Sequence, residues 1–323
     1  MIFPGREGRL SEEKLVSSRE KHITETLMRI ILPNYEIWEQ EPGEDGIYRQ
    51  VERAGRVCYK SEDRATKDSA RPFAQRMINN QHTAMLEHAT VYLRAKQGEL
   101  PFYATNRFSV VKSAQGHDYI TTNLRVLAQN GKMDDLEYLS DYTPNHERRV
   151  TVHFTTQISI TREYNRHRVN SIAEQSTRYC NYNKDKFGNE ITINLPSWVK
   201  EMTNQDVKEE QGQEAFIQLC RDITEGLTDE WNEVDYWNFG NLAAEFSYLS
   251  LIKMGRTPQE ARAVLPLDTN TELVHTAFVS DWLHFFDLRA KGTTGAPHPD
   301  AKALAWPLME EFIRRGYIDA AKD

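Results

Sequence analysis

The chain of 323 residues has few cysteines, no long apolar run and no excess of positive charge. Its three cysteines, Cys58, Cys180 and Cys220, are far apart and form no CxxC pair, which argues against a disulfide framework and against a zinc site. Low cysteine usage fits a reducing compartment, so we expect a cytoplasmic protein. No apolar stretch approaches the roughly 20 residues of a membrane-spanning helix, so we expect no membrane association. The N-terminal residues lack an apolar segment followed by a cleavage site, so we expect no signal peptide.

The charge balance argues against a dedicated nucleic-acid binder. The formal net charge is −8, whereas such proteins usually carry a basic domain or stripe. Hydrophobic residues make up 39% of the chain and charged residues 27%, as in a folded globular protein. We expect an N-terminal arm over residues 1–46 and a single domain over 47–323, with an insert at about 97–148.

Strands are expected mainly in the first half of the chain. The clearest is residues 150–161, where apolar and polar residues alternate, from Val150 to Ile160. Further strands are expected over 88–96 and within 187–196. Helices are expected over 47–60, 68–80 and 123–130. Asp68 or Ser69 is expected to cap the helix over 68–80, and Gly131 to end the helix over 123–130.

From about residue 205 the pattern becomes helical. Helices are expected over 216–231, 241–254, 258–265 and 272–289, the third begun by a capping box of Thr257 and Glu260. Pro307 is expected to break or kink the last helix. Strands early and helices late predict an α+β fold, with a central, mostly antiparallel sheet flanked by helices and a helical C-terminal half.

Positive charge is concentrated in TREYNRHRVNSIAEQSTRY, residues 161–179, which holds Arg162, Arg166, Arg168 and Arg178. One interpretation is a solvated helix face with ion pairs such as Glu163 with His167. The other is a site for a small anionic ligand, because arginine's planar fork suits phosphate and carboxylate. Acidic and amide groups among the arginines suggest a ligand that also has donors, such as a nucleobase.

Two arginines lie far downstream on segments that are otherwise apolar. Arg262 is in EARAVLP and Arg289 is in FFDLRA, and both are expected to be buried; the alternative is a cation at a helix end. QHTAMLEHA contains His82 and His88, but their spacing does not fit one helical face, so they form a poor metal site. A structural role is the alternative for both, and for His284.

The string RHRVNSIAEQS, Arg-His-Arg followed by seven residues and Ser, resembles the signature of the flavin-dependent thymidylate synthases. Thr177, Arg178 and Tyr179 continue the resemblance. Four other segments occur in the order found in that family: ERAGRVCY, HTAMLEH, YLSLIKMGRTPQEARAVLP and HFFDLRA. The resemblance covers roughly residues 50–315, with the insert and the arm largely outside it.

The resemblance implies a methyltransferase. Such enzymes convert dUMP to dTMP with methylenetetrahydrofolate as the one-carbon donor and FAD, reduced by NADPH, as the hydride source. The family forms homotetramers whose active sites are shared between subunits. No metal is implied.

Roles for individual residues are also implied by the resemblance. Arg289 would be the catalytic cation beside the pyrimidine ring, because a fixed positive charge stabilises negative charge that develops there. The dUMP site would comprise Glu163, Tyr164, Asn165, Arg166, Glu174, Gln175, Ser176, Thr177, Arg178, Arg262 and Arg289. The flavin would contact His82, Arg166, His167, Arg168, Glu174 and His284.

Four positions depart from the family pattern. Ala84 stands where serine or threonine is usual, and Ala173 where asparagine is common. Glu163 replaces a frequent glutamine and Phe278 an asparagine. Each departure removes or alters a hydrogen-bonding group at its position.

Two other functions compete with this interpretation. One is an enzyme whose nucleophile is Cys58 or Cys180, the latter favoured by nearby positive charge. The other is a non-catalytic nucleic-acid-binding module that uses the basic segment and Tyr179 for backbone and stacking contacts. The acidic net charge opposes the second.

Overall fold

The computed structural model describes residues 28–203 and 212–319, which divide into two compact units. Of the described residues, unit 2 comprises 32–180, 194–198 and 267–319, and unit 1 comprises 28–31, 181–193, 199–203 and 212–266. Residues 1–27, most of the expected arm, lie outside the described part. None of the helices in the described ranges combines the length and apolar character that a membrane crossing requires.

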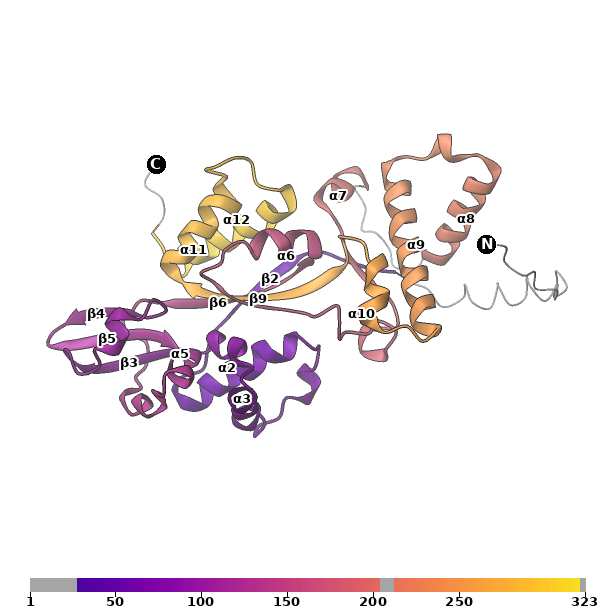
Figure 1. Ribbon diagram of the computed structural model, residues 1–323. Coiled ribbons are helices and arrows are strands. Elements are labelled where there is room, and N and C mark those ends of the chain that lie inside the picture. Colours follow the sequence, from indigo (N-terminus) through magenta and orange to yellow (C-terminus); the bar gives the residue numbers. More distant parts are fainter. Residues whose placement is uncertain (1–27, 204–211, 320–323) are drawn as a thin grey trace, which may run out of the picture. The chain divides into compact units, whose positions relative to one another are not determined.

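Unit 2 is built on a four-stranded antiparallel sheet. Its strands, in spatial order, are β2 Asn34–Trp38, β6 Arg149–Gln157, β9 Asn270–Phe278 and β7 Ser171–Glu174. Helices α6 Ile158–Tyr164, α11 Val279–Phe286 and α12 Pro299–Arg314 lie over one face, and α2 Gly43–Val57 and α3 Ala70–Asn79 over the other (Figure 1). This arrangement confirms the α+β prediction.

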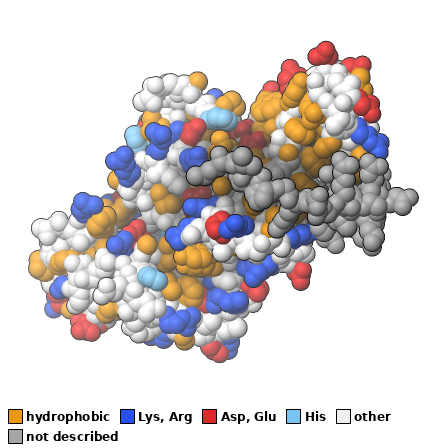
Figure 2. Space-filling view, turned by 45° about the vertical axis from the view of Figure 1, so that its right-hand side comes forward, with side chains coloured by type: hydrophobic (Ala, Val, Ile, Leu, Met, Phe, Trp, Pro, Cys, Tyr) orange, Lys and Arg blue, Asp and Glu red, His pale blue; other side chains and the backbone are white. Residues whose placement is uncertain are grey.

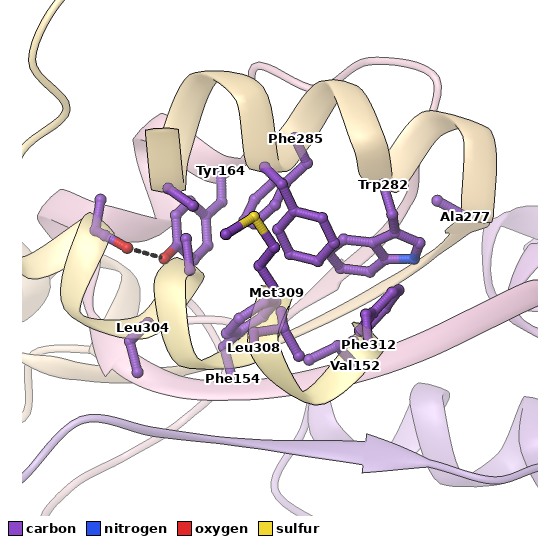
Figure 3. Close-up of a cluster of buried hydrophobic side chains, with 14 of the residues drawn as sticks. Val152, Phe154, Tyr164, Ala277, Trp282, Phe285, Leu304, Leu308, Met309 and Phe312 are labelled. Carbon is purple, nitrogen blue, oxygen red and sulfur yellow. Dashed lines mark hydrogen bonds between the residues drawn. The ribbon is translucent and has the colours of Figure 1, made fainter. Parts of the chain in front are cut away.

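Aromatic side chains fill the core between the sheet and the helices α6, α11 and α12. Phe154 of β6 packs against Tyr164 of α6, with ring centroids 5.0 Å apart, and Trp282 packs against Phe285 at 5.1 Å (Figure 3). The Tyr164 hydroxyl donates to the backbone carbonyl of Ala301 at 2.8 Å, the dashed line in Figure 3. Because these large side chains are fully buried, they hold α6 and α11 firmly against the sheet.

The expected insert belongs to a second antiparallel sheet in the order β3 Thr90–Lys96, β5 His117–Asn123, β4 Val110–Ala114. Helices α4 Phe102–Thr105 and α5 Leu124–Gln129 accompany it, and Gly131 follows α5 at φ +63°, a conformation that favours glycine. The core of this sheet includes side chains from α2 and α3, so the insert extends unit 2.

The sequence predictions for two elements of unit 2 were wrong. The strand expected over 150–161 ends at Gln157, and α6 begins at Ile158. The helix expected over 272–289 is instead strand β9, then α11, then a π-helical turn, η8 Asp287–Lys291. Most of β9 is buried on both faces, so its sequence NTELVHTAF shows no alternation of apolar and polar residues by which to recognise a strand. Pro307 lies inside α12 and does not end it.

Unit 1 is mainly helical. It contains α8 Gly212–Glu225, α9 Glu233–Lys253 and α10 Pro258–Ala261, and strand β1 Arg29–Ile31 pairs with β8 Thr192–Asn194. Helix α7, Ser197–Thr203, begins in unit 2 and continues into unit 1. The capping box of Thr257 and Glu260 is present, as predicted. The helix expected to reach residue 231 ends at Glu225, and Gly226 follows at φ +74°.

Candidate functional site

The candidate site is built around the basic segment, residues 161–179, which runs from α6 through β7 to Tyr179. Arg289 reaches this segment from the π-helical turn η8. Its Nη1 donates to the Glu163 carboxylate at 2.8 Å, its Nη2 to the Glu163 backbone carbonyl at 2.8 Å, and its Nε to Nε2 of His167 at 3.2 Å. π-Helical turns are rare and often occur at functional sites. Three residues named by the resemblance are therefore in direct contact.

His167 is held as a neutral ring. Because Arg289 donates to Nε2, the remaining ring proton is placed on Nδ1. Burial lowers the pKa of His167 to about 4, with further contributions from Arg289 and His284. The ring packs against Phe285 at 4.9 Å and edge-on to His284 at 5.8 Å. His284 is exposed. The two histidine rings therefore form a surface at the basic segment that an aromatic ligand could contact.

Glu174, the last residue of β7, joins the strand to α6. One carboxylate oxygen accepts from Thr161 Oγ1 at 2.7 Å and the other from Asn165 Nδ2 at 2.9 Å. Gln175 is buried, and its backbone N–H donates to the Glu272 carbonyl on β9 at 2.8 Å. The two halves of the candidate dUMP site are thus held at fixed separation by the sheet.

The segment after Gln175 is anchored through its backbone. The Ser176 N–H donates to the Cys58 carbonyl at 2.9 Å, and Ser176 Oγ accepts from the Arg178 N–H at 3.3 Å. The exposed Arg178 side chain lies over the Tyr179 ring, which is 5.4 Å from that of Tyr59. A fixed backbone with an exposed cation suits an anionic group.

The interpretation of the basic segment as a self-neutralised helix face is not supported. Glu163 pairs with Arg289 and not with His167. Arg166 and Arg168 are exposed, and neither forms an ion pair with any residue in the described ranges. Arg166 and Arg168 therefore present positive charge that no ion pair within the described residues offsets.

The structure corrects the expected burial of Arg262 and limits the expected role of Tyr164 to its backbone. Arg262 was expected to be buried; it lies in unit 1 on the short turn η7 Arg262–Val264 and is exposed. The Tyr164 side chain is fully buried in the core, so only its backbone could reach a ligand. Arg289 is largely buried, with 16% of its side chain exposed.

The two histidines of HTAMLEH have different environments. His82 is exposed at the start of the turn η2 Thr83–His88, next to the exposed Ala84. His88 is fully buried, its Nδ1 lies 2.9 Å from Thr276 Oγ1, and burial lowers its pKa to about 3. Within the described ranges, no three His, Cys, Asp or Glu side chains are grouped so that they could hold a metal ion.

The geometry also weakens the cysteine alternative. Burial raises the pKa of Cys58 to about 11, which keeps its thiol protonated near neutral pH. Cys180 is fully buried. Neither side chain is placed as an exposed, activated nucleophile.

Sequence reasoning missed a polar cluster close to this segment. Glu272 of β9 pairs with Lys60 through one oxygen and lies 3.0 Å from His153 Nε2 through the other. It also missed Arg149, at the start of β6. These residues come from distant parts of the chain, and only the pairing of β6 with β9 brings His153 to Glu272.

Comparison with known proteins gives one family and a set of weakly similar solved structures. A family model described as "thymidylate synthase complementing protein" matches residues 113–315. This range includes part of the expected insert and leaves out ERAGRVCY and HTAMLEH. Two solved structures of the UMP/dUMP methylase PolB from Streptomyces cacaoi, bound with 5-Br dUMP or 5-Br UMP, are similar at 15% identity and a TM-score of 0.38. The aligned region covers 89% of this chain and 93% or 92% of those chains. No curated protein matches the sequence.

Proposed function

The chain belongs to the family of thymidylate synthase complementing proteins, the flavin-dependent thymidylate synthases, and from this premise we propose that it methylates dUMP at C5 to give dTMP. Methylenetetrahydrofolate is the proposed one-carbon donor and NADPH the proposed reductant. The single observation that carries the proposal is the position of Arg289, a largely buried guanidinium fixed by Glu163 and His167 beside the basic segment.

Arg289 is suited to stabilise negative charge on the pyrimidine. For C5 to act as a nucleophile, negative charge must build up on the pyrimidine ring, and a preorganised cation lowers the energy of that state. An arginine has five N–H groups, and Arg289 uses three of them on Glu163 and His167. One N–H on each terminal nitrogen remains for a ligand. Two such donors fit adjacent acceptors such as a ring nitrogen and a carbonyl oxygen.

The proposed dUMP site has two sides. Glu163, Tyr164, Asn165 and Arg166 form one side, with Tyr164 contributing backbone only. Glu174, Gln175, Ser176, Thr177 and Arg178 form the other, with Ser176 and Arg178 near the phosphate. The backbone hydrogen bonds of Ser176 and Gln175 support this assignment because they fix the position of the segment.

The residues also fit FAD. The exposed Arg166 and Arg168, without ion pairs in the described ranges, suit its diphosphate, and the ring pair of His167 and His284 suits an aromatic group. His82 and Glu174 complete the proposed flavin contacts. When bound and reduced, FAD would supply the hydride that completes the methyl group. The residues of this chain would bind it, orient it and exclude water.

Arg262 is proposed to bind dUMP within a homotetramer whose sites are shared. Its exposed position supports a role at a contact with a ligand or a second subunit. The low cysteine content supports a cytoplasmic location. A nucleic-acid-binding function has little support, because Lys and Arg side chains on the face drawn in Figure 2 are spread among acidic and apolar ones.

The test begins with the visible absorbance spectrum of the purified protein, titrated with FAD and then with dUMP. We expect a stoichiometric flavin spectrum that shifts when dUMP is added. Turnover is then followed as formation of dTMP with NADPH and methylenetetrahydrofolate. Failure to bind any flavin, in a protein that still binds dUMP, would reject the proposed reaction and leave a nucleotide-binding function.

A further inference from the structure

A partly buried cation lies outside the residues assigned so far. Arg149 is the first residue of β6, directly after the insert, and is paired in the sheet with Phe278 of β9. Its Nη1 donates to the Glu87 backbone carbonyl at 3.1 Å and to Thr90 Oγ1 at 3.4 Å, and its Nη2 donates to Ser171 Oγ at 3.2 Å. Its guanidinium carbon lies 5.4 Å from the centre of the Phe278 ring.

These contacts place Arg149 among three segments proposed to hold the flavin. Glu87 belongs to the turn that follows His82, and Ser171 follows the Arg166–Arg168 segment. Phe278 precedes α11, which carries His284. One guanidinium therefore touches all three segments.

No carboxylate within the described ranges forms an ion pair with Arg149, although that of Glu87 lies near enough to raise its pKa. The Glu87 carboxylate forms its ion pair with Arg125 of α5, and the hydrogen bond from Arg149 goes to the Glu87 backbone carbonyl. Burial is the largest effect on the pKa of Arg149 and lowers it to about 10, so the side chain remains charged at neutral pH. Asp281 lies near enough to raise that pKa but forms no ion pair with Arg149. Buried charges are normally paired, because an unpaired one is costly to desolvate.

Two of the five N–H groups of Arg149 have no acceptor among the described residues. Three are used on Glu87, Thr90 and Ser171, and the buried Nε has no partner. We propose that Arg149 is a further cofactor-binding residue that holds an anionic group of the flavin dinucleotide. This inference rests on the proposed function. The anionic group is either the diphosphate or the flavin ring when it is reduced and negatively charged.

The test measures the dissociation constants of FAD and dUMP for the full-length protein and its variants. Arg149→Gln removes the charge and keeps N–H donors for the Glu87 carbonyl, while Arg149→Lys keeps the charge. We expect Arg149→Gln to weaken FAD binding about 10- to 100-fold, as for loss of a charge-assisted hydrogen bond, and to leave dUMP binding unchanged. Arg149→Lys should lose less than about tenfold. Arg148→Gln is the matched control, since Arg148 stacks on Tyr142 and Tyr317 and should leave both constants unchanged.

The outcomes separate the possible causes. Equal FAD affinity together with an equal midpoint potential in the wild type and in Arg149→Gln would overturn the inference. Equal losses in the Gln and Lys variants would also overturn it, because they would indicate a structural role. A wild-type protein that binds no flavin would instead reject the proposed function, and the inference with it. Two further measurements identify which anionic group Arg149 holds: the dissociation constant of riboflavin, which lacks the diphosphate, and the midpoint potential of the bound flavin. A loss confined to FAD indicates the diphosphate, and a more negative potential in Arg149→Gln indicates the reduced ring.

Discussion

Arg289 and Glu163 are joined by two hydrogen bonds, one to the carboxylate and one to the backbone carbonyl, both at 2.8 Å. The paired geometry fixes the plane of the guanidinium and not only its charge. An aliphatic ammonium could keep the charge but not the plane, so Arg289→Lys separates the two contributions.

For Arg289→Lys we expect dUMP binding to weaken by less than about tenfold and turnover to fall by about 100- to 1000-fold, as when a preorganised donor is lost. Single-turnover rates of dTMP formation at saturating dUMP measure this. Near-normal rates in the Lys variant would remove Arg289 from the catalytic role.

His167 should make stability depend on pH. Its pKa is about 4 in the folded protein and about 6.5 when unfolded, so the unfolded state binds more protons between these values. The stabilising effect of the neutral ring is therefore complete above about pH 6.5 and is lost as the pH falls toward about 4. Urea unfolding of wild type and His167→Gln across this range isolates the effect from carboxylate titration. We expect a shallower pH dependence in the variant, and parallel curves would contradict the assignment.

Cys180→Ala tests the cysteine alternative. The side chain is small and fully buried, so we expect a loss of about 1 kcal/mol in the free energy of unfolding and substantial turnover. Unfolding by urea and the rate of dTMP formation measure the two effects. Complete loss of turnover in a folded variant would instead support a nucleophilic thiol.

Local sequence patterns predicted the helices α2 and α3 and strand β3 well, because the apolar residues in each recur at the spacing typical of a helix or a strand. Strand β9 was read as a helix because its two buried faces remove the alternation that marks a strand. The contact between Arg289 and Glu163 spans 126 positions, so no local signal could predict it, although the family resemblance named both residues. Arg149 was missed for the same reason, since its partners Glu87 and Ser171 are brought together only by the folded sheets.

Glu163 offers the sharpest test of how the guanidinium is prepared, because its carboxylate both orients Arg289 and partly neutralises it. Glu163→Gln keeps an oxygen acceptor for Nη1 but removes the negative charge, so Arg289 should remain oriented with a stronger field toward the ligand. Glu163→Ala removes the acceptor and leaves only the backbone contact. We expect Glu163→Gln to keep turnover within about tenfold of the wild type and Glu163→Ala to lose at least about 100-fold. Single-turnover rates of dTMP formation for both variants, with folding checked by circular dichroism, show whether Glu163 acts by orienting Arg289 or through its negative charge. If Gln were as damaging as Ala, the carboxylate's charge itself would be required, and its role would be chemical and not one of orientation.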